Sequence, residues 1–385
     1  MVSSEEGALE AGVAGSLCGL RVLHVGKYYP PHRGGMETHL QDLCGGLKRS
    51  VEIEVLVASD AGRTTEELVD GVRVTRVGTA FDLSAAPVCP QMVHKIRRAK
   101  ADLVHIHLPH PTAILAYLMS GHRGRLIFSY HSDIIRQRVL SKAFWPIQQH
   151  ALKRAGAIIA ASPNYLSTSP ALSKFEGRCR VIPYGIPLGQ FDRPNAIEVA
   201  RIRKKYGPRI VLGVGRLVYY KGFEYLIRAM KDVDARLLIV GDGPLRDRLE
   251  REARACGLEE RVTLLTDVED VVPYYHAAAL FALPSVARSE AFGIVQLEAM
   301  ACGKAVVNTD LNSGVTFASP GGVTGLTVPP ANAEALARAI NTLLDDTALS
   351  ARMGLAGRRR VEREFDLDVM TRRTLELYEE VMTKG

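Results

Sequence analysis

The sequence predicts an α/β protein with two Rossmann-like, doubly wound parallel-sheet domains that face a cleft. Three observations lead to this fold class. The chain has 385 residues, more than one hydrophobic core usually organises. Short β-rich apolar runs alternate with helical segments in both halves, which is typical of parallel sheets covered on both faces. A stretch rich in Gly, Pro and charge interrupts this alternation near the middle.

The first domain is expected at residues 21–185. The preceding segment, 1–20, lacks the basic start and the long apolar run of a signal peptide, so we interpret it as a flexible tail. Strand-like runs in this half are separated by turns or helical patterns. They lie at 21–26, 51–58, 72–78, 102–107, 125–130, 157–161 and 179–184.

Residues 186–208 form the interrupting stretch, and we interpret them as a linker. A second domain is expected at 209–365, followed by a final helix at 366–385. Its strand-like runs lie at 209–215, 235–241, 261–266, 279–284 and 304–309. Two such domains in succession predict a ligand site at the carboxyl ends of the strands.

Composition narrows the classes of function. Hydrophobic residues make up 47% of the chain, yet no apolar run reaches the roughly 18 residues of a membrane span. The six cysteines form no CxxC pair, which argues against zinc ribbons and thioredoxin-like chemistry. We therefore expect a soluble, cytoplasmic protein with reduced thiols, whose formal charge of +7 favours anionic partners.

The most informative segment is SEAFGIVQLEAMACGKAVV, residues 289–307. A helix that begins near Phe292 and Gly293 would point its first N–H groups away from the sheet, where they could bind a phosphate. Glu290 would lie just before this helix. Glu298 would lie about two turns into it, where its carboxylate could accept hydrogen bonds from a ribose diol.

A second segment, GVGRLVYYKGFEYLI at 213–227, places two cations close to one strand end. Arg216 directly follows the strand, and Lys221 opens the next helix. A departing diphosphate gains negative charge, so two fixed cations would stabilise the transition state more than the ground state.

Two segments of the first domain complete the candidate site. The run GKYYPPHRGGMETHLQDL, 26–43, contains Gly34 and Gly35, whose backbone could approach a ligand closely. SYHSD, 129–133, places His131 at a strand end, where it could hydrogen-bond a sugar hydroxyl.

Together these segments resemble glycosyltransferase family 4, the retaining enzymes of the GT-B fold. YPPHRGGMETH, IVGDGPLRDRLE and TGLTVPP also read like the family, and the resemblance extends from about Arg21 to the C-terminus. It implies a hexosyltransferase that uses a nucleotide diphosphate sugar, GDP-mannose or a UDP-sugar, and that acts on a glycan, lipid-linked or small-molecule acceptor in polysaccharide assembly. It also implies that the last helix crosses back onto the first domain.

The resemblance assigns roles to residues of both domains. Glu290 and the backbone of Phe292, Gly293 and Ile294 would hold the donor sugar and its phosphates, and Glu298 would hold the ribose. Arg216 and Lys221 would hold the diphosphate, Gly34 and Gly35 would approach it from the first domain, and His131 would face the sugar. The family's usual IPNGVD is IPYGIP here, with Tyr184 and Pro187, and GKPVV is GKAVV, with Ala305.

We expect no cofactor and no metal in the reaction. The two Asp-x-Asp strings, at 232–234 and 366–368, do not follow strands, so we interpret both as structural. A dinucleotide dehydrogenase is disfavoured because neither Gly213-Val-Gly215 nor Gly241-Asp-Gly243 continues to the third glycine of GxGxxG.

Two other functions stay open. One is a GT-B sugar-nucleotide epimerase or hydrolase, and the other is a non-catalytic partner protein that binds nucleotide sugars. The basic segments at 94–100 and 357–363 have no interleaved aromatic residues, which disfavours nucleic acid as a partner. For 94–100 we consider peripheral contact with anionic lipid at the inner face of the membrane as a hypothesis.

Overall fold

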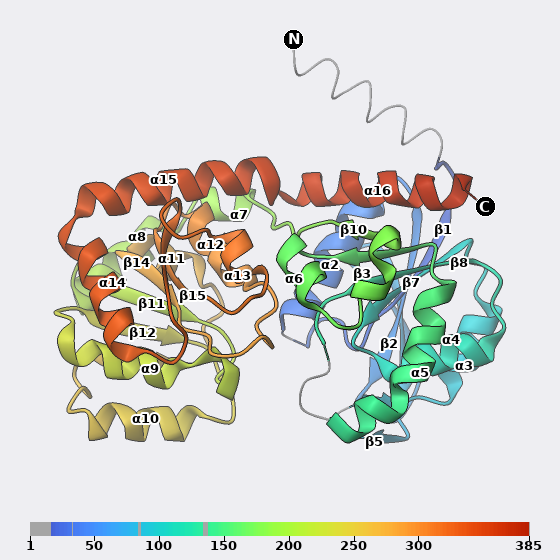
Figure 1. Cartoon of the computed structure of the whole chain (residues 1–385), viewed down its shortest axis with the longest axis horizontal. Helices are drawn as coiled ribbons and strands as arrows, with labels where there is room; N and C mark the ends of the chain where they lie inside the picture. The colour runs from blue at the N-terminus through green and yellow to red at the C-terminus, as the bar shows by residue number, and fades with distance from the viewer. Residues whose placement is uncertain (1–16, 33, 84–85, 134–137, 385) are drawn as a thin grey trace, which may run out of the picture. The chain divides into compact units, whose positions relative to one another are not determined.

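The computed structural model describes residues 17–32, 34–83, 86–133 and 138–384, and divides the chain into two compact units. The first unit comprises Met1–Gly185 with Leu367–Gly385, and the second comprises Ile186–Asp366. Each contains a parallel sheet between helices, so the predicted two-domain α/β fold is confirmed. Figure 1 shows the elements of both units.

The first unit is built on a sheet in the order β10-β9-β8-β7-β1-β2-β4-β3, parallel except for the β3–β4 hairpin at one edge. Its sheet strands are β1 (Arg21–Val25), β2 (Glu52–Ser59), β3 (Thr65–Val69), β4 (Val72–Gly78), β7 (Leu103–Leu108), β8 (Arg125–Tyr130), β9 (Ala157–Ala160) and β10 (Cys179–Val181). A separate hairpin pairs β5 (Phe81–Leu83) with β6 (Ala86–Val88).

The helices of this unit form two groups. On one side α2 (Gly35–Leu47) packs against α16 (Leu367–Thr383), and on the other α3 (Gln91–Arg98), α4 (Pro111–Ser120) and α5 (Arg138–Arg154) contact one another in turn. The short α6 (Pro163–Thr168) and the 3₁₀ helix η1 (Ser173–Arg178) lead to β10. Leu17 and Leu20 are buried in this core, whereas residues 1–16 of the expected tail lie outside the described residues.

Helix α16 follows the second unit in the sequence but belongs to the first. Its residue Tyr378 is fully buried, and the helix passes so close to α2 that a Cβ atom at Gly46 would collide with the Thr371 hydroxyl. The end of the chain therefore helps to build the core of the first unit.

The second unit has a six-stranded sheet in the order β13-β12-β11-β14-β15-β16, and all its strand pairs are parallel. Its strands are β11 (Ile210–Val214), β12 (Arg236–Val240), β13 (Val262–Leu265), β14 (Leu280–Leu283), β15 (Val306–Thr309) and β16 (Gly325–Val328). The order reverses between β11 and β14, which is the place where such sheets bind ligands.

Helices cover both faces of this sheet. One group contains α9 (Phe223–Ala229), α10 (Arg246–Ala255) and α14 (Ala333–Asp345), which contribute to an apolar cluster of buried residues. The other contains α8 (Ala196–Tyr206), α11 (Val272–Ala277), α12 (Ile294–Ala301) and α15 (Thr347–Glu364). The remaining short elements are α7 (Gly189–Asp192), α13 (Gly314–Ala318) and the 3₁₀ helices η2 (Tyr219–Lys221) and η3 (Met230–Asp232).

The structure corrects the interpretation of 186–208 as a linker. These residues lie in the second unit and contain α7 and α8. Asn195 caps α8 by accepting a hydrogen bond from the Glu198 amide, and Ile202 and Tyr206 are buried. Composition alone suggested a linker because charged residues surround these few apolar anchors. Among the described residues, no helix is both long enough and apolar enough to cross a bilayer.

Candidate functional site

In the second unit, the predicted charged residues gather at the carboxyl ends of β11 and β14, on either side of the point where the strand order reverses. Arg216 follows β11 by two residues, and Lys221 ends η2 in the same loop. Glu290 lies between β14 and α12. The sheet topology therefore brings two distant segments of the sequence together at one edge.

Lys221 and Glu290 form a buried ion pair. The ammonium nitrogen lies 2.6 Å from a Glu290 carboxylate oxygen, and both side chains are about one-tenth exposed. The same oxygen accepts a hydrogen bond of 3.0 Å from the Ser285 hydroxyl. The stem of Lys221 lies against Gly215, where a Cβ atom would be 3.1 Å from Lys221 Cε. A lysine ammonium has three donors, so the pair with Glu290 leaves further N–H groups for a ligand.

Arg216 differs from Lys221 in its surroundings. Its side chain is exposed, and the structure gives it no ion-pair partner among the described residues. An arginine guanidinium presents several N–H donors in a planar fork that suits phosphate oxygens. The loop after β11 thus offers one cation held by a carboxylate and one that is available to an anion.

Helix α12 begins at Ile294, directly after Gly293. Gly293 has φ 74°, and a Cβ atom there would lie 2.6 Å from Leu283 Cδ2, so the position requires glycine. The side chain of Phe292 is buried against Phe317 and Phe365. This segment therefore presents backbone to a ligand, and the first N–H groups of α12 have no acceptor within the helix.

Glu298 lies one turn into α12, closer to its start than the two turns predicted. Its carboxylate accepts a hydrogen bond of 2.7 Å from the hydroxyl of Tyr275 in α11. Burial raises the pKa of Glu298, while the Tyr275 hydrogen bond and the nearby Lys221 act to lower it. The carboxylate is held in one orientation, with a second oxygen that can accept from a diol.

The first unit contains the other predicted residues. Gly34 and Gly35 stand exposed at the start of α2, and Gly34 is extended, with φ 178°. His131 follows β8 and is only 6% exposed. Its Nε2 atom is 3.0 Å from His107 Nδ1, and its Nδ1 atom is 2.6 Å from the Tyr184 hydroxyl. To bind a sugar hydroxyl, the imidazole would have to exchange one of these partners.

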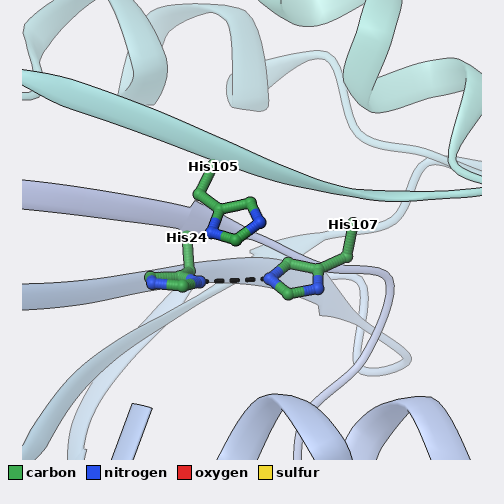
Figure 2. A group of neighbouring side chains, drawn as sticks. All are labelled: His24, His105 and His107. Atoms are coloured by element: carbon green, nitrogen blue, oxygen red, sulfur yellow. Dashed lines mark hydrogen bonds between the residues drawn. The ribbon is translucent and has the colours of Figure 1, made fainter. Parts of the chain in front are cut away.

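His131 belongs to a buried network that sequence reasoning missed. Six hydrogen bonds of 2.6–3.2 Å join seven side chains in one line. In order, these are Ser129, His105, Tyr378, His24, His107, His131 and Tyr184. Figure 2 shows three of the imidazoles, with the bond between His24 and His107 dashed.

Strand geometry explains why these rings meet. Side chains two residues apart point to the same face of a strand, and His24 pairs in register with His105 on the neighbouring strand. His105 and His107 therefore lie on one face of β7, the face that α2 and α16 cover. The alternation His-x-His within the apolar run 102–107 was the available signal.

The remaining charged motifs have the following positions and contacts. Asp232 and Asp234 precede β12, at the opposite end of the strands from Arg216. In the basic segment 94–100, Lys95 pairs with Glu66, and Arg97 donates to carbonyl groups at the end of α4. In 357–363, Arg358 pairs with Asp192 and Glu362.

Comparison with known proteins shows the family to which this chain is similar. The family model described as "Glycosyl transferases group 1" matches residues 195–360, and the model described as "Glycosyltransferase Family 4" matches residues 33–190. O-antigen chain mannosyltransferase C of Escherichia coli is 32% identical over 93% of this chain and 98% of its own length. D-rhamnosyltransferase WbpZ of Pseudomonas aeruginosa is 34% identical over 87% of this chain and 89% of its own.

Solved structures share the fold. A sucrose-phosphate synthase from Thermosynechococcus elongatus superposes with a TM-score of 0.80 at 24% identity, over 95% of this chain and all of the other. Anabaena Alr3699/HepE, in complex with UDP and glucose, gives 0.78 at 22% identity, over 94% of this chain and all of the other. The fold and these relatives define a glycosyltransferase of the GT-B type. The chain belongs to glycosyltransferase family 4.

Proposed function

We propose that this enzyme moves a hexose from a nucleotide diphosphate sugar to a hydroxyl of a glycan or lipid-linked acceptor, with retention of configuration and without a divalent metal in the reaction. The observation that carries the proposal is the position of Arg216 and the Lys221–Glu290 pair at the carboxyl edge of β11 and β14. A diphosphate bound there would meet two cations and the start of α12.

The charges suit departure of a diphosphate. As the bond between the sugar's anomeric carbon and the phosphate oxygen breaks, its electron pair goes to the diphosphate, and Arg216 and Lys221 compensate the new charge. The acceptor oxygen then bonds to the anomeric carbon, and its proton goes to the leaving phosphate oxygen. Such a reaction needs positioning and charge compensation rather than an enzymic nucleophile.

Each donor-binding group has a proposed role. The N–H groups of Gly293 and Ile294 hold phosphate oxygens, Glu290 holds the sugar, and Glu298 accepts from the ribose diol. From the first unit, we propose that Gly34 and Gly35 present backbone to the phosphates and that His131 faces the sugar.

The donor is proposed from relatives. A relative from Mycolicibacterium smegmatis, 31% identical over 86% of this chain, is named a GDP-mannose-dependent mannosyltransferase. The Escherichia coli relative is named for mannosyl transfer in O-antigen. These names favour GDP-mannose and surface polysaccharide assembly, with a UDP-sugar as the other donor because a structural neighbour holds UDP.

The test combines binding and product analysis. Nucleotide sugars are first screened by thermal shift, because a ligand that binds only the folded state raises its apparent stability. Transfer to an acceptor panel is then followed by proton NMR of the new linkage, and we expect the anomeric configuration of the donor. Free nucleotide without acceptor turnover, or interconversion of two nucleotide sugars, would instead identify the hydrolase or epimerase. Binding without any turnover would identify the partner protein.

A further inference from the structure

His131 belongs to the hydrogen-bonded line of the first unit, and both of its ring nitrogens are engaged. Its Nε2 atom is 3.0 Å from His107 Nδ1, and its Nδ1 atom is 2.6 Å from the Tyr184 hydroxyl. A sugar hydroxyl that replaced His107 would break the line in its interior. A sugar hydroxyl that replaced Tyr184 would exchange one O–H group for another and leave the other five bonds in place. Nδ1 is therefore the nitrogen that suits a sugar.

Each bond in the line fixes the direction of the next one. Burial lowers the pKa of His24 to about 3 and that of His131 to about 4. It also lowers the pKa of His105 and His107, so all four rings are neutral near neutral pH. A neutral imidazole donates from one nitrogen and accepts at the other. The Tyr378 hydroxyl, between His24 and His105, likewise donates one bond of the line and accepts one. The line therefore has only two fully bonded orders, which run in opposite directions.

The distances around Tyr378 distinguish these two orders. Its hydroxyl oxygen is 2.7 Å from His105 Nδ1 and 3.2 Å from His24 Nε2. Bonds donated by a hydroxyl are usually shorter than bonds donated by a nitrogen, so Tyr378 donates to His105 and accepts from His24. The bond of 2.6 Å at the end of the line is short in the same way, with the Tyr184 hydroxyl as donor to His131. Two separate places in the line thus indicate one order.

In this order the proton of His131 lies on Nε2. Because His24 donates from Nε2 to Tyr378, its Nδ1 atom accepts from His107 Nε2. Figure 2 shows this bond as the dashed line between His24 and His107. His107 Nδ1 then accepts from His131 Nε2. The Nδ1 atom of His131 keeps its lone pair and acts as an acceptor for a hydroxyl that lies against it.

We propose that Tyr378 is a positioning residue for the donor sugar. Through His24 and His107 it keeps the proton of His131 on Nε2, so that Nδ1 accepts a hydrogen bond from a hydroxyl of the hexose. The bond made by one imidazole nitrogen sets the protonation of the other, which is how a distant hydroxyl acts on this ring. The inference rests on the proposed function, in which His131 faces the sugar. It gives α16, which carries Tyr378, a role in the first unit beyond packing.

The first test determines the tautomer of His131 directly. Nitrogen-15 NMR of the full-length protein with labelled histidine distinguishes protonated from unprotonated ring nitrogens, and His131→Gln identifies the signals of that ring by their absence. In the parent we expect a single tautomer, protonated on Nε2. In Tyr378→Phe the buried N–H group of His24 loses its acceptor, which is costly, so the tautomer of His131 that is protonated on Nδ1 should appear.

The second test separates the sugar from the nucleotide. Calorimetry compares GDP-mannose with GDP, and UDP-glucose with UDP, for the parent and Tyr378→Phe. Because His131 faces the sugar, the variant should bind the nucleotide sugar about tenfold more weakly and the free diphosphate as tightly as the parent does. A purely structural role for Tyr378 would weaken both ligands alike.

Two further variants control these results. Ser129→Ala removes the group at the opposite end of the line, which accepts from His105 Nε2 in the assigned order. It should shift the tautomer of His131 in the same direction as Tyr378→Phe, because the whole line responds to either change. Tyr117→Phe removes the hydroxyl of another buried tyrosine of the first unit, outside the line, and should match the parent in both tests.

A parent protein with His131 protonated on Nδ1 overturns the proposal, as does an unchanged tautomer in a folded Tyr378→Phe variant. If that variant does not fold, an unchanged tautomer in Ser129→Ala has the same consequence. Equal affinity of the parent and Tyr378→Phe for the nucleotide sugar also overturns it, and so does an equal loss for the sugar and the free diphosphate. Failure of the proposed function is distinguishable, because the parent would then bind neither nucleotide sugar while His131 kept the expected tautomer. The role of Tyr378 at the sugar would fall with it.

Discussion

In the second unit, charged side chains meet at the ends of β11 and β14, whereas in the first unit buried imidazoles form a hydrogen-bonded line between the sheet and the helices α2 and α16. Lys221 and Glu290 place opposite charges 2.6 Å apart. The histidines have no carboxylate in their hydrogen-bonded line, and burial suppresses their charge. Burial disfavours charge in both places, and an oppositely charged partner offsets this penalty only where one is present.

The largest effect is expected at the ion pair. Lys221→Met should abolish transfer and also lower the free energy of unfolding by about 3–5 kcal/mol, because it leaves Glu290 buried and unpaired. The double variant Lys221→Met/Glu290→Gln should recover much of the stability and none of the activity. Denaturant unfolding and a transfer assay measure the two quantities. A fully active Lys221→Met enzyme would contradict the proposed role.

Substitutions of Arg216 should lower activity without lowering stability. Arg216→Ala should lower kcat about 10²–10³-fold, the usual consequence of removing one group that stabilises developing charge. Because its side chain is exposed, the Tm should not change. Arg216→Lys keeps the charge without the planar fork and should fall between parent and alanine variant. A loss of Tm that parallels the loss of activity would show a structural role instead.

Lowering the pH should destabilise the first unit more than the second. Burial lowers the pKa of His24 to about 3 and that of His131 to about 4, below the ordinary histidine value of about 6.5. At a pH between the folded and unfolded pKa values, each such histidine binds a proton in the unfolded chain but not in the folded protein. The stability that this histidine contributes above pH 6.5 is therefore lost as the pH falls, at up to about 1.4 kcal/mol per pH unit for each histidine.

The second unit contains a single histidine, His276, so calorimetry between pH 7 and pH 5 should show the first unit destabilised more strongly. As a control, His94→Gln, an exposed substitution on α3, should leave the pH dependence unchanged. Equal slopes for both units would contradict the assignment of neutral, buried imidazoles.

The smallest effect is expected from Mg²⁺ and Mn²⁺. After dialysis, adding either ion should leave the transfer rate unchanged if, as proposed, the cationic groups of the second unit compensate the charge of the diphosphate. The assay compares initial rates with and without each ion at saturating donor. A strict requirement for one of them would contradict the proposed charge compensation.

Most of the fold was predictable because burial and periodicity act over short stretches. The predicted strand runs correspond to every strand of the two larger sheets except β3 and β16. Strand β3 was not predicted because its side chains are largely exposed and no apolar run marks it. Strand β16 was not predicted because TGLTVPP begins and ends with turn-forming residues. Helix α8 was hidden by its charged face.

The site was predictable only in part. Its motif marks Arg216, Lys221 and Glu290, but a linear sequence does not show that Lys221 and Glu290 neutralise each other, because their contact depends on the order of β11 and β14. The histidine network depends on three strands and on Tyr378, which lies 273 residues after His105. Each histidine by itself is typical of a core residue whose hydrogen bonds are made. Only the register of the strands shows that these histidines form one hydrogen-bonded line.

The most direct test is the affinity of the parent enzyme for GDP and GMP, or UDP and UMP, measured by calorimetry. If Arg216, Lys221 and the start of α12 hold a diphosphate, the diphosphate should bind at least about tenfold more tightly, equivalent to 1.4 kcal/mol. Most of that difference should disappear in Arg216→Ala. Equal affinities for the mono- and diphosphate in the parent would contradict the account.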